Sequence, residues 1–116
     1  MKIDIIAGAR PNFIKIAPII EAIKKEQTNG NNIIFRLVHT GQHYDKKMSG
    51  DFFKQLGISK PDINLKVGSG TQSEQTANIM IRYEQLLLNK RSDICLVVGD
   101  VTSTMACSIV AKKMGM

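Results

Sequence analysis

The chain has 116 residues, of which 43% are hydrophobic and 22% charged, and its formal net charge is +6. This length suits one small domain with a single core, and we expect neither a membrane span nor a signal peptide because no apolar run is long enough. The positive charge favours an anionic partner, but nucleic acid, a nucleotide or an acidic protein would each satisfy it.

Apolar residues recur with two alternating periods, as expected where strands alternate with helices. The pattern predicts strands over residues 2–7, 33–39, 63–67 and 94–98. It predicts helices over residues 11–27, 45–56, 72–89 and 102–114. This alternation is typical of an α/β, Rossmann-like domain, whose parallel sheet has helices on both faces. We expect the strand order 3-2-1-4, which leaves the fourth strand at an edge of the sheet.

Two of the predicted helices have an apolar stripe that we expect to face the sheet. In the first helix the stripe consists of Ile16, Ile19, Ile20 and Ile23. In the third helix it consists of Ala77, Met80, Ile81, Leu87 and Leu88, with Glu84 as a polar interruption.

Local signals mark several helix ends. Pro18 is expected to kink or interrupt the first helix, because proline lacks the N–H that the helix would use. Thr71 and Glu74 have the spacing of a capping box at the start of the third helix. Gly115 suits the C′ position after the last helix.

The stretch GARPNFIKIAP, residues 8–18, places Arg10 and Lys15 at the start of the first helix. Cations are mildly unfavourable there, because a helix N-terminus carries partial positive charge. A bound anion reverses this argument, since free N–H groups beside an arginine and a lysine form a phosphate site. From spacing alone, a phosphate site and two simply exposed cations are equally good interpretations.

The stretch VVGDVTSTMACS, residues 97–108, ends the fourth strand and opens the last helix. Asp100 has a simple structural explanation there, as an N-cap. Ligands of open α/β sheets, however, bind beyond the carboxyl ends of the strands, where the strand order reverses. If the first and fourth strands are neighbours, Arg10 and Asp100 face one crevice, in which the carboxylate could act as an acid or base.

Three other features have simpler interpretations. His39 and His43 in HTGQHYDKKM are separated by a turn, and without a cysteine or carboxylate cluster they favour local hydrogen bonding over a metal site. The glycine-rich GSGTQSEQT, residues 68–76, lacks the lysine of a P-loop and is interpreted as a connection. Cys95 and Cys107 have the spacing of neither a zinc site nor a secreted disulfide framework, so we expect buried, reduced thiols in a cytoplasmic protein.

Together and in this order, these stretches resemble the non-hydrolysing UDP-N-acetylglucosamine 2-epimerases. GARPNFIKIAP is similar to the family's G-T-R-P-x-x-I-K-x-A-P opening, TGQHYDKKM to its T-G-Q-H segment and GDVTSTMACS to its G-D-T-T-T-T segment. The departures are small: Ala9, Val101 and Ser103 each replace a threonine. The resemblance covers essentially the whole of this chain. A family member is longer, however, and the resemblance covers only about its first third. We therefore expect residues 1–116 to be the N-terminal part of the first Rossmann-like domain of a GT-B-like protein, without its second domain.

The resemblance implies an isomerase that interconverts UDP-GlcNAc and UDP-ManNAc, by loss of UDP to give a glycal and re-addition after inversion at C2. By matched position, Arg10 and Lys15 meet the UDP phosphates or the reacting sugar, and Asp100 is a catalytic carboxylate. Gln42 and His43 lie in the segment that, in some bacterial members, contacts a second, activating UDP-GlcNAc. Neither a nicotinamide nor a metal cofactor is implied.

The resemblance also implies partners and a setting. The partners are the UDP-sugar, the missing C-terminal domain and, in a homodimer, a second copy, with no nucleic acid or membrane among them. The setting is polysaccharide biosynthesis in the cytoplasm. Because other catalytic groups lie beyond Met116, we expect the isolated chain to be inactive.

Other classes of protein fit the sequence less well or remain open. The acceptor-side domain of a GT-B glycosyltransferase would use the same sheet, and a non-enzymatic anion-binding α/β module would explain the charge. A dinucleotide-binding oxidoreductase would need G-x-G-x-x-G after the first strand, and a phospho-acceptor signalling domain would need acidic residues where this chain has AGARP. A nucleic-acid-binding module would need a basic run or a stacking motif.

Overall fold

The computed structural model describes residues 1–41 and 50–116. In this part of the chain, four strands form one parallel sheet in the order β3-β2-β1-β4, which confirms the strand order expected from the sequence. The strands are β1 (Lys2–Ala7), β2 (Ile34–His39), β3 (Ile63–Asn64) and β4 (Ile94–Leu96). The helices are α1 (Arg10–Thr28), α2 (Gly50–Gln55), α3 (Gln72–Asn89) and α4 (Thr102–Lys113).

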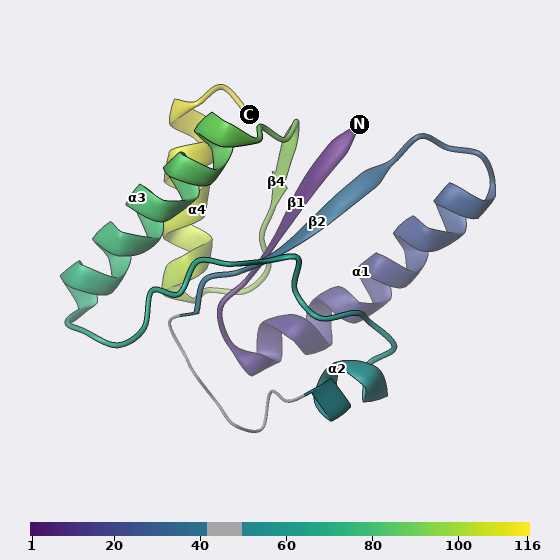
Figure 1. Ribbon diagram of the computed structural model, residues 1–116, viewed down its shortest axis with the longest axis horizontal. Helices are drawn as coiled ribbons and strands as arrows, with labels where there is room; N and C mark the ends of the chain where they lie inside the picture. Colours follow the sequence, from purple (N-terminus) through teal and green to yellow (C-terminus); the bar gives the residue numbers. More distant parts are fainter. Residues whose placement is uncertain (42–49) are drawn as a thin grey trace.

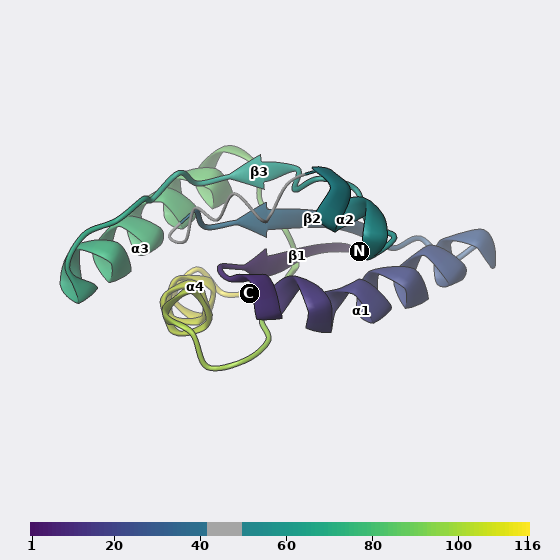
Figure 2. The same cartoon turned by 90° about the horizontal axis from the view of Figure 1, so that it is seen from below.

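Helices cover both faces of the sheet, as predicted. Figure 1 shows α1 and α2 on one side of the strands and α3 and α4 on the other. Figure 2 shows β3, β2 and β1 in succession across the sheet. Because successive side chains of a strand point to opposite faces, Ile5 joins the core beneath α1, and Ile6 joins the core beneath α3 and α4. The sheet therefore separates two apolar cores.

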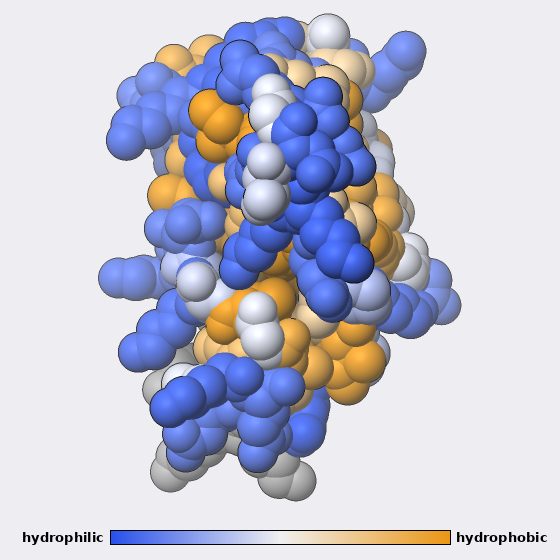
Figure 3. Space-filling model, turned by 90° about the vertical axis from the view of Figure 1, so that its right-hand side faces the viewer, coloured by the Kyte–Doolittle hydropathy of each residue, from blue (hydrophilic) through white to orange (hydrophobic). Residues whose placement is uncertain are grey.

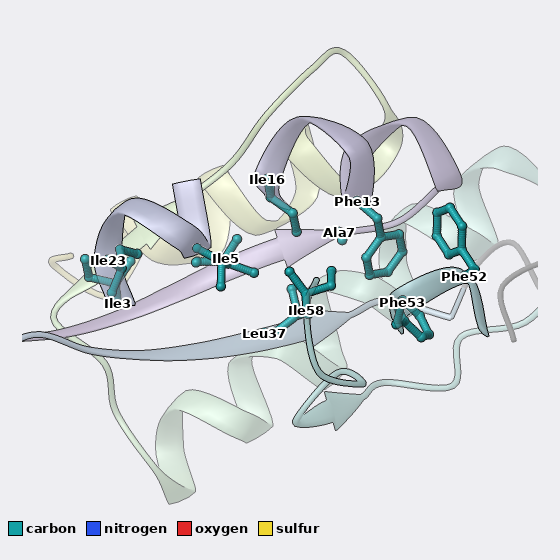
Figure 4. Packing of buried hydrophobic residues seen from close by; sticks show 11 residues of the cluster. Ile3, Ile5, Ala7, Phe13, Ile16, Ile23, Leu37, Phe52, Phe53 and Ile58 are labelled. Atoms are coloured by element: carbon teal, nitrogen blue, oxygen red, sulfur yellow. The ribbon is translucent and has the colours of Figure 1, made fainter. Parts of the chain in front are cut away.

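The core beneath α1 and α2 follows the sequence prediction closely. The predicted stripe of α1 faces the sheet: Ile16, Ile20 and Ile23 are buried and Ile19 is partly buried. Figure 4 shows how this core continues into an aromatic cluster. Phe13 packs edge-on against Phe52 and Phe53 of α2, at centroid distances of 6.3 and 5.2 Å. Hydrophilic side chains run along the outer side of this layer (Figure 3).

The predicted inward face of α3 is wrong, apart from Leu87 and the partly buried Met80, which packs against the core. The residues that this helix buries are Ile79, Tyr83 and Leu87. Ala77 is exposed, Met80 is partly buried, and Ile81 and Leu88 are 53% and 70% exposed. At 100° per residue, α3 has two apolar stripes about 140° apart. The Tyr83 hydroxyl donates to the buried carboxylate of Asp4 at 2.9 Å, which favours the stripe that contains Tyr83.

Several local expectations about α1 and β3 also needed correction. Pro18 does not interrupt α1, which continues from Arg10 to Thr28 with Pro18 on its exposed side. β3 is two residues long, where five were predicted, because Lys66 has a φ of +54° that an extended strand does not allow. The Leu65 and Val67 side chains are nevertheless buried, as the alternating pattern indicated. The helix predicted over residues 45–56 corresponds, within the described residues, to α2.

The start of α3 and the end of α4 agree with the predictions. Glu74 N–H donates to Thr71 Oγ1, and Thr71 N–H donates to Glu74 Oε1, each at 3.1 Å. These two contacts form the expected capping box, and the hydrogen bonds from Thr71 lower the pKa of the Glu74 carboxyl. Gly115 follows α4 with a φ of +81°, as a C′ glycine should.

Candidate functional site

The β1–α1 turn and the β4–α4 turn lie at the same end of the sheet. β1 and β4 pair in parallel, with Ile3 opposite Ile94 and Ile5 opposite Leu96. From β1 the chain continues to β2 on one side and returns to β4 on the other, so the strand order reverses between β1 and β4. Such a switch point is where open α/β sheets bind their ligands. The two turns are therefore the first place to look for a functional site.

A buried amide side chain, Asn12, joins the two turns. Its Oδ1 accepts hydrogen bonds from the backbone N–H groups of Gly8 and Ala9, both at 2.9 Å. Its Nδ2 donates to the carbonyl oxygen of Val98, 3.3 Å away. Thr104 Oγ1 donates to the same carbonyl at 3.0 Å. Val98 thus receives a hydrogen bond from the first turn of each helix.

Asn12 is the N3 residue of α1, and its side-chain oxygen makes the N3 half of a capping box by accepting from the N–H of the N-cap Ala9. Ala9 is the N-cap of α1 and has no side-chain oxygen that could accept a hydrogen bond from the backbone. Asn12 supplies an acceptor from inside the helix, and so satisfies backbone donors that precede it. Sequence reasoning missed Asn12. The available signal was the combination of an alanine N-cap with an asparagine three residues later.

The two turns come so close together that Gly8 has no room for a side chain. A Cβ at this position would lie 2.5 Å from Ser103 Oγ and 3.1 Å from Thr40 Oγ1. Ser103 lies in the first turn of α4, Thr40 follows β2, and both are buried. Thr40 Oγ1 has no hydrogen-bond partner within the described residues. Glycine at position 8 therefore allows the ends of β1 and β2 and the start of α4 to converge.

Lys15 reaches the β4–α4 turn, where Asp100 is located. Lys15 Nζ lies 3.8 Å from the position that a Cβ of Gly99 would occupy. Asp100 is exposed, and its carboxylate has no hydrogen-bond or ion-pair partner in residues 1–41 and 50–116. The N-cap of α4 is Val101, so the interpretation of Asp100 as an N-cap is wrong. An ammonium group thus lies beside the residue that precedes an unpaired carboxylate, an arrangement suited to binding an anion and moving a proton.

Arg10 extends toward α2. Its Cζ lies 4.8 Å from the centroid of the Phe52 ring, within the range of a cation–π contact. Arg10 is exposed. The two predicted anion-binding cations thus occupy different sides of the β1–α1 turn, with Lys15 on the side of Gly99.

Comparison with known proteins identifies the family. The family model described as UDP-N-acetylglucosamine 2-epimerase matches residues 25–116. The chain belongs to this family. It is 41% identical to the UDP-N-acetylglucosamine 2-epimerase of Methanocaldococcus jannaschii, over 98% of this chain and 30% of the relative. It is 43% identical to the UDP-2,3-diacetamido-2,3-dideoxy-D-glucuronate 2-epimerase of Pseudomonas aeruginosa, over 98% of this chain and 31% of the relative.

Solved structures of UDP-N-acetylglucosamine 2-epimerases have the same fold over this length. The M. jannaschii enzyme in complex with UDP-GlcNAc and UDP matches with a TM-score of 0.88 at 41% identity, over 98% of this chain and 30% of that one. The Neisseria meningitidis enzyme bound to UDP-GlcNAc matches with a TM-score of 0.83 at 31% identity, over 98% and 29%. The chain therefore spans about 30% of the length of these relatives. The predicted GT-B-like α/β class is confirmed, and the epimerase is favoured over the glycosyltransferase and the anion-binding module.

Of the stretch HTGQHYDKKM, residues 39–48, the structure describes residues 39–41. Gln42 and His43 lie outside the described residues. His39 is buried at the end of β2, where its Nδ1 accepts a hydrogen bond from Gly41 N–H at 3.1 Å. Its ring also packs edge-on against Phe13, at a centroid distance of 5.3 Å. His39 thus has the local hydrogen bonding that the sequence favoured.

Both cysteines are free, as expected for reduced thiols. Cys107 is buried and Cys95 is partly buried, and burial raises the pKa of each thiol. Within residues 1–41 and 50–116 no group of three or more histidine, cysteine, aspartate or glutamate side chains could hold a metal ion. No helix in the same ranges is long and apolar enough to cross a bilayer.

Proposed function

We propose that the protein to which this chain belongs interconverts UDP-GlcNAc and UDP-ManNAc. The observation that supports this most directly is the position of Lys15 beside Gly99 at the switch point of the sheet, in a chain of the epimerase family. In the proposed reaction the C2 proton and UDP are lost to give a glycal, and both are added back with the proton on the opposite face of C2. Neither a nicotinamide nor a metal cofactor takes part.

The roles that we propose for this chain's residues follow from charge. The departing UDP accumulates negative charge, and Lys15 and Arg10 would stabilise it through charge-assisted hydrogen bonds. Asp100 would act as an acid or base, or otherwise assist the chemical step, because a free carboxylate at the switch point of the sheet can exchange a proton with substrate. Gln42 and His43, in the stretch TGQHYDKKM, would contribute to binding the UDP-sugar.

The proposal includes partners and a compartment. The second domain would supply the remaining catalytic groups, and the edge strand β4, on which Ile94 is 40% exposed, would pair with the rest of the first domain's sheet. A second copy would pair through the outer sides of α3 and α4, where Ile81, Leu88 and Met105 are each more than half exposed. Free cysteines fit the cytoplasm, because that compartment keeps thiols reduced.

The test is conversion of UDP-GlcNAc by the full-length protein, followed by proton NMR in D₂O. We expect UDP-ManNAc to accumulate and deuterium to enter at C2, because the C2 proton leaves during the reaction. Asp100→Asn should lower the rate by about 10²-fold or more. The circular dichroism of this variant should not change, since Val101 and not Asp100 is the N-cap of α4. A wild-type protein that converts no nucleotide sugar would reject the proposal.

A second substrate deserves a parallel assay, because the P. aeruginosa relative is 43% identical to this chain. Its name specifies UDP-2,3-diacetamido-2,3-dideoxy-D-glucuronate, and inversion at C2 of that sugar would need the same groups. The two assays are compared by kcat/KM. If the value is higher for this compound, the proposed reaction, inversion at C2, still holds, but the substrate is this sugar and not UDP-GlcNAc.

A further inference from the structure

α1 and α4 carry the candidate groups of the site but do not lie on the same face of the sheet. α1 packs on one core and α4 on the other, and Figure 1 shows the two helices on opposite sides of the strands. The two helices therefore cannot fix each other's position by packing along their lengths. The distance between Lys15 of α1 and Asp100 before α4 depends instead on how the strand ends are joined.

Asn12 makes that connection with both ends of its amide. The oxygen holds the β1–α1 turn through Gly8 and Ala9, and the nitrogen holds the end of β4 through Val98. The side chain is 3% exposed, so solvent does not compete for these contacts. A carboxylate at this position could accept the first two hydrogen bonds but could not donate the third.

The side chains of Asn12 and Lys15 both end beside Gly99 in the β4–α4 turn. A Cβ of Gly99 would lie 3.4 Å from Asn12 Nδ2 and 3.8 Å from Lys15 Nζ. The two residues are three positions apart in α1, so they project from neighbouring turns of the helix on one side. The hydrogen bond from Asn12 to Val98 thus joins the first turns of α1, from which Lys15 projects, to the chain segment just before Gly99 and Asp100.

We propose that Asn12 is a positioning residue, which sets the distance between Lys15 and Asp100 by binding the ends of β1 and β4 at once. The catalytic consequence of this role rests on the proposed epimerase function, whereas the geometric role does not. Displacing catalytic groups by about 1 Å costs about 10²-fold in rate, so loss of the connection slows turnover more than it weakens substrate binding.

The test compares Asn12→Asp with Thr104→Val in the full-length protein. Asn12→Asp keeps the acceptor for the β1–α1 turn and removes the donor to Val98. Thr104→Val is the matched control, because it removes the other hydrogen bond to the same carbonyl without touching α1. We expect Asn12→Asp to lower kcat by about 10- to 100-fold with little change in KM. Thr104→Val should lower the melting temperature but keep kcat within about threefold of wild type.

A second variant covers the case in which Asn12→Asp does not fold. Asn12→Ala removes the contact with Val98 together with the hydrogen bonds from Gly8 and Ala9, and adding Ala9→Ser gives α1 an N-cap side chain that offsets part of the lost stability. The double variant should fold and show the same loss of kcat. Wild-type kcat in either Asn12 variant, or an equal loss of kcat in Thr104→Val, would overturn the proposal.

Crystal structures of the wild-type and Asn12→Asp proteins provide a measurement that needs no turnover. We expect the distance between Lys15 Nζ and the Asp100 carboxylate to differ between them, and an unchanged distance would overturn the positioning role. If the wild-type protein converts neither nucleotide sugar, the proposed function fails, and the crystal comparison still decides the role of Asn12.

Discussion

Asp4 of β1 and Arg36 of β2 form a buried ion pair with two hydrogen bonds. Arg36 Nε donates to Asp4 Oδ1 at 2.7 Å, and Nη2 donates to Oδ2 at 2.8 Å. The same carboxylate accepts hydrogen bonds from the Tyr83 hydroxyl at 2.9 Å and the Ser92 hydroxyl at 2.7 Å. One side chain thus ties together two strands, α3 and the segment before β4. Because Asp4 is fully buried, each of these contacts is shielded from water.

Asp4→Asn should destabilise the protein strongly. The amide removes the negative charge and leaves the Arg36 guanidinium buried without a counter-charge, which costs about 3–5 kcal/mol. Urea unfolding measures this loss. Asp93→Asn is the matched control, because exposed Asp93 accepts one backbone hydrogen bond, from Lys2, that an asparagine oxygen can still accept. This control should change stability by less than about 0.5 kcal/mol, and equal losses in the two variants would contradict the prediction.

The protein should lose stability at alkaline pH. Burial raises the pKa of the Cys107 thiol and of the Tyr83 hydroxyl above their usual values. In the unfolded chain they ionise near their usual pKa values of about 8.5 and about 10. The unfolded chain thus releases protons that the folded chain retains, so their contribution is complete below about pH 8.5 and falls as the pH rises.

The melting temperature measured from pH 7 to pH 10.5 tests this prediction. Cys107→Ala should reduce the part of the decrease that begins near pH 8.5, because it removes the buried thiol. Cys95→Ala serves as a comparison at a partly buried thiol, and it should have a smaller effect. A melting temperature that stays constant up to pH 10.5 would show that these groups ionise without unfolding.

Local patterns predicted most of the fold, because local forces determine most of it. Turn and cap residues such as Thr71 and Gly115 act within a few residues of themselves, and the alternation of strands and helices restricts the sheet to few topologies. The inward face of α3 was not predictable, since two apolar stripes compete and the Tyr83 contact with Asp4 spans 79 residues. Asn12 was missed for the same reason, as its partner Val98 is 86 residues away.

Gly8→Ala should destabilise the protein by about 1–3 kcal/mol, because a methyl group there overlaps Ser103 and Thr40 and the two turns must separate. Thermal unfolding measures the loss. Adding Ser103→Ala removes the oxygen at 2.5 Å and should recover part of the lost stability. Gly50→Ala is the control, because among the described residues a Cβ there meets only the flexible end of Lys60 at 3.5 Å. If the double variant is no more stable than Gly8→Ala, the overlap with Ser103 is not the cause.

Lys15→Ala in the full-length protein should lower kcat/KM for the UDP-sugar by at least about tenfold, since it removes a charge-assisted contact with the departing UDP. Arg10→Ala should act in the same direction. Lys24→Ala is the matched control, because it removes one exposed lysine from the same helix, near the end away from the site.

Kinetics at low and high salt concentration distinguish a specific contact of Lys15 with UDP from the general effect of a net charge of +6. A loss that reflects only overall charge should be the same in Lys15→Ala and Lys24→Ala, and it should disappear at high ionic strength, where exposed charges are screened. A contact with UDP persists at high salt, because the anion and the ammonium group are then in direct contact. Steady-state kinetics at low and high salt therefore distinguish the two. If Lys15→Ala and Lys24→Ala have the same kcat/KM at both salt concentrations, Lys15 does not contact the UDP-sugar.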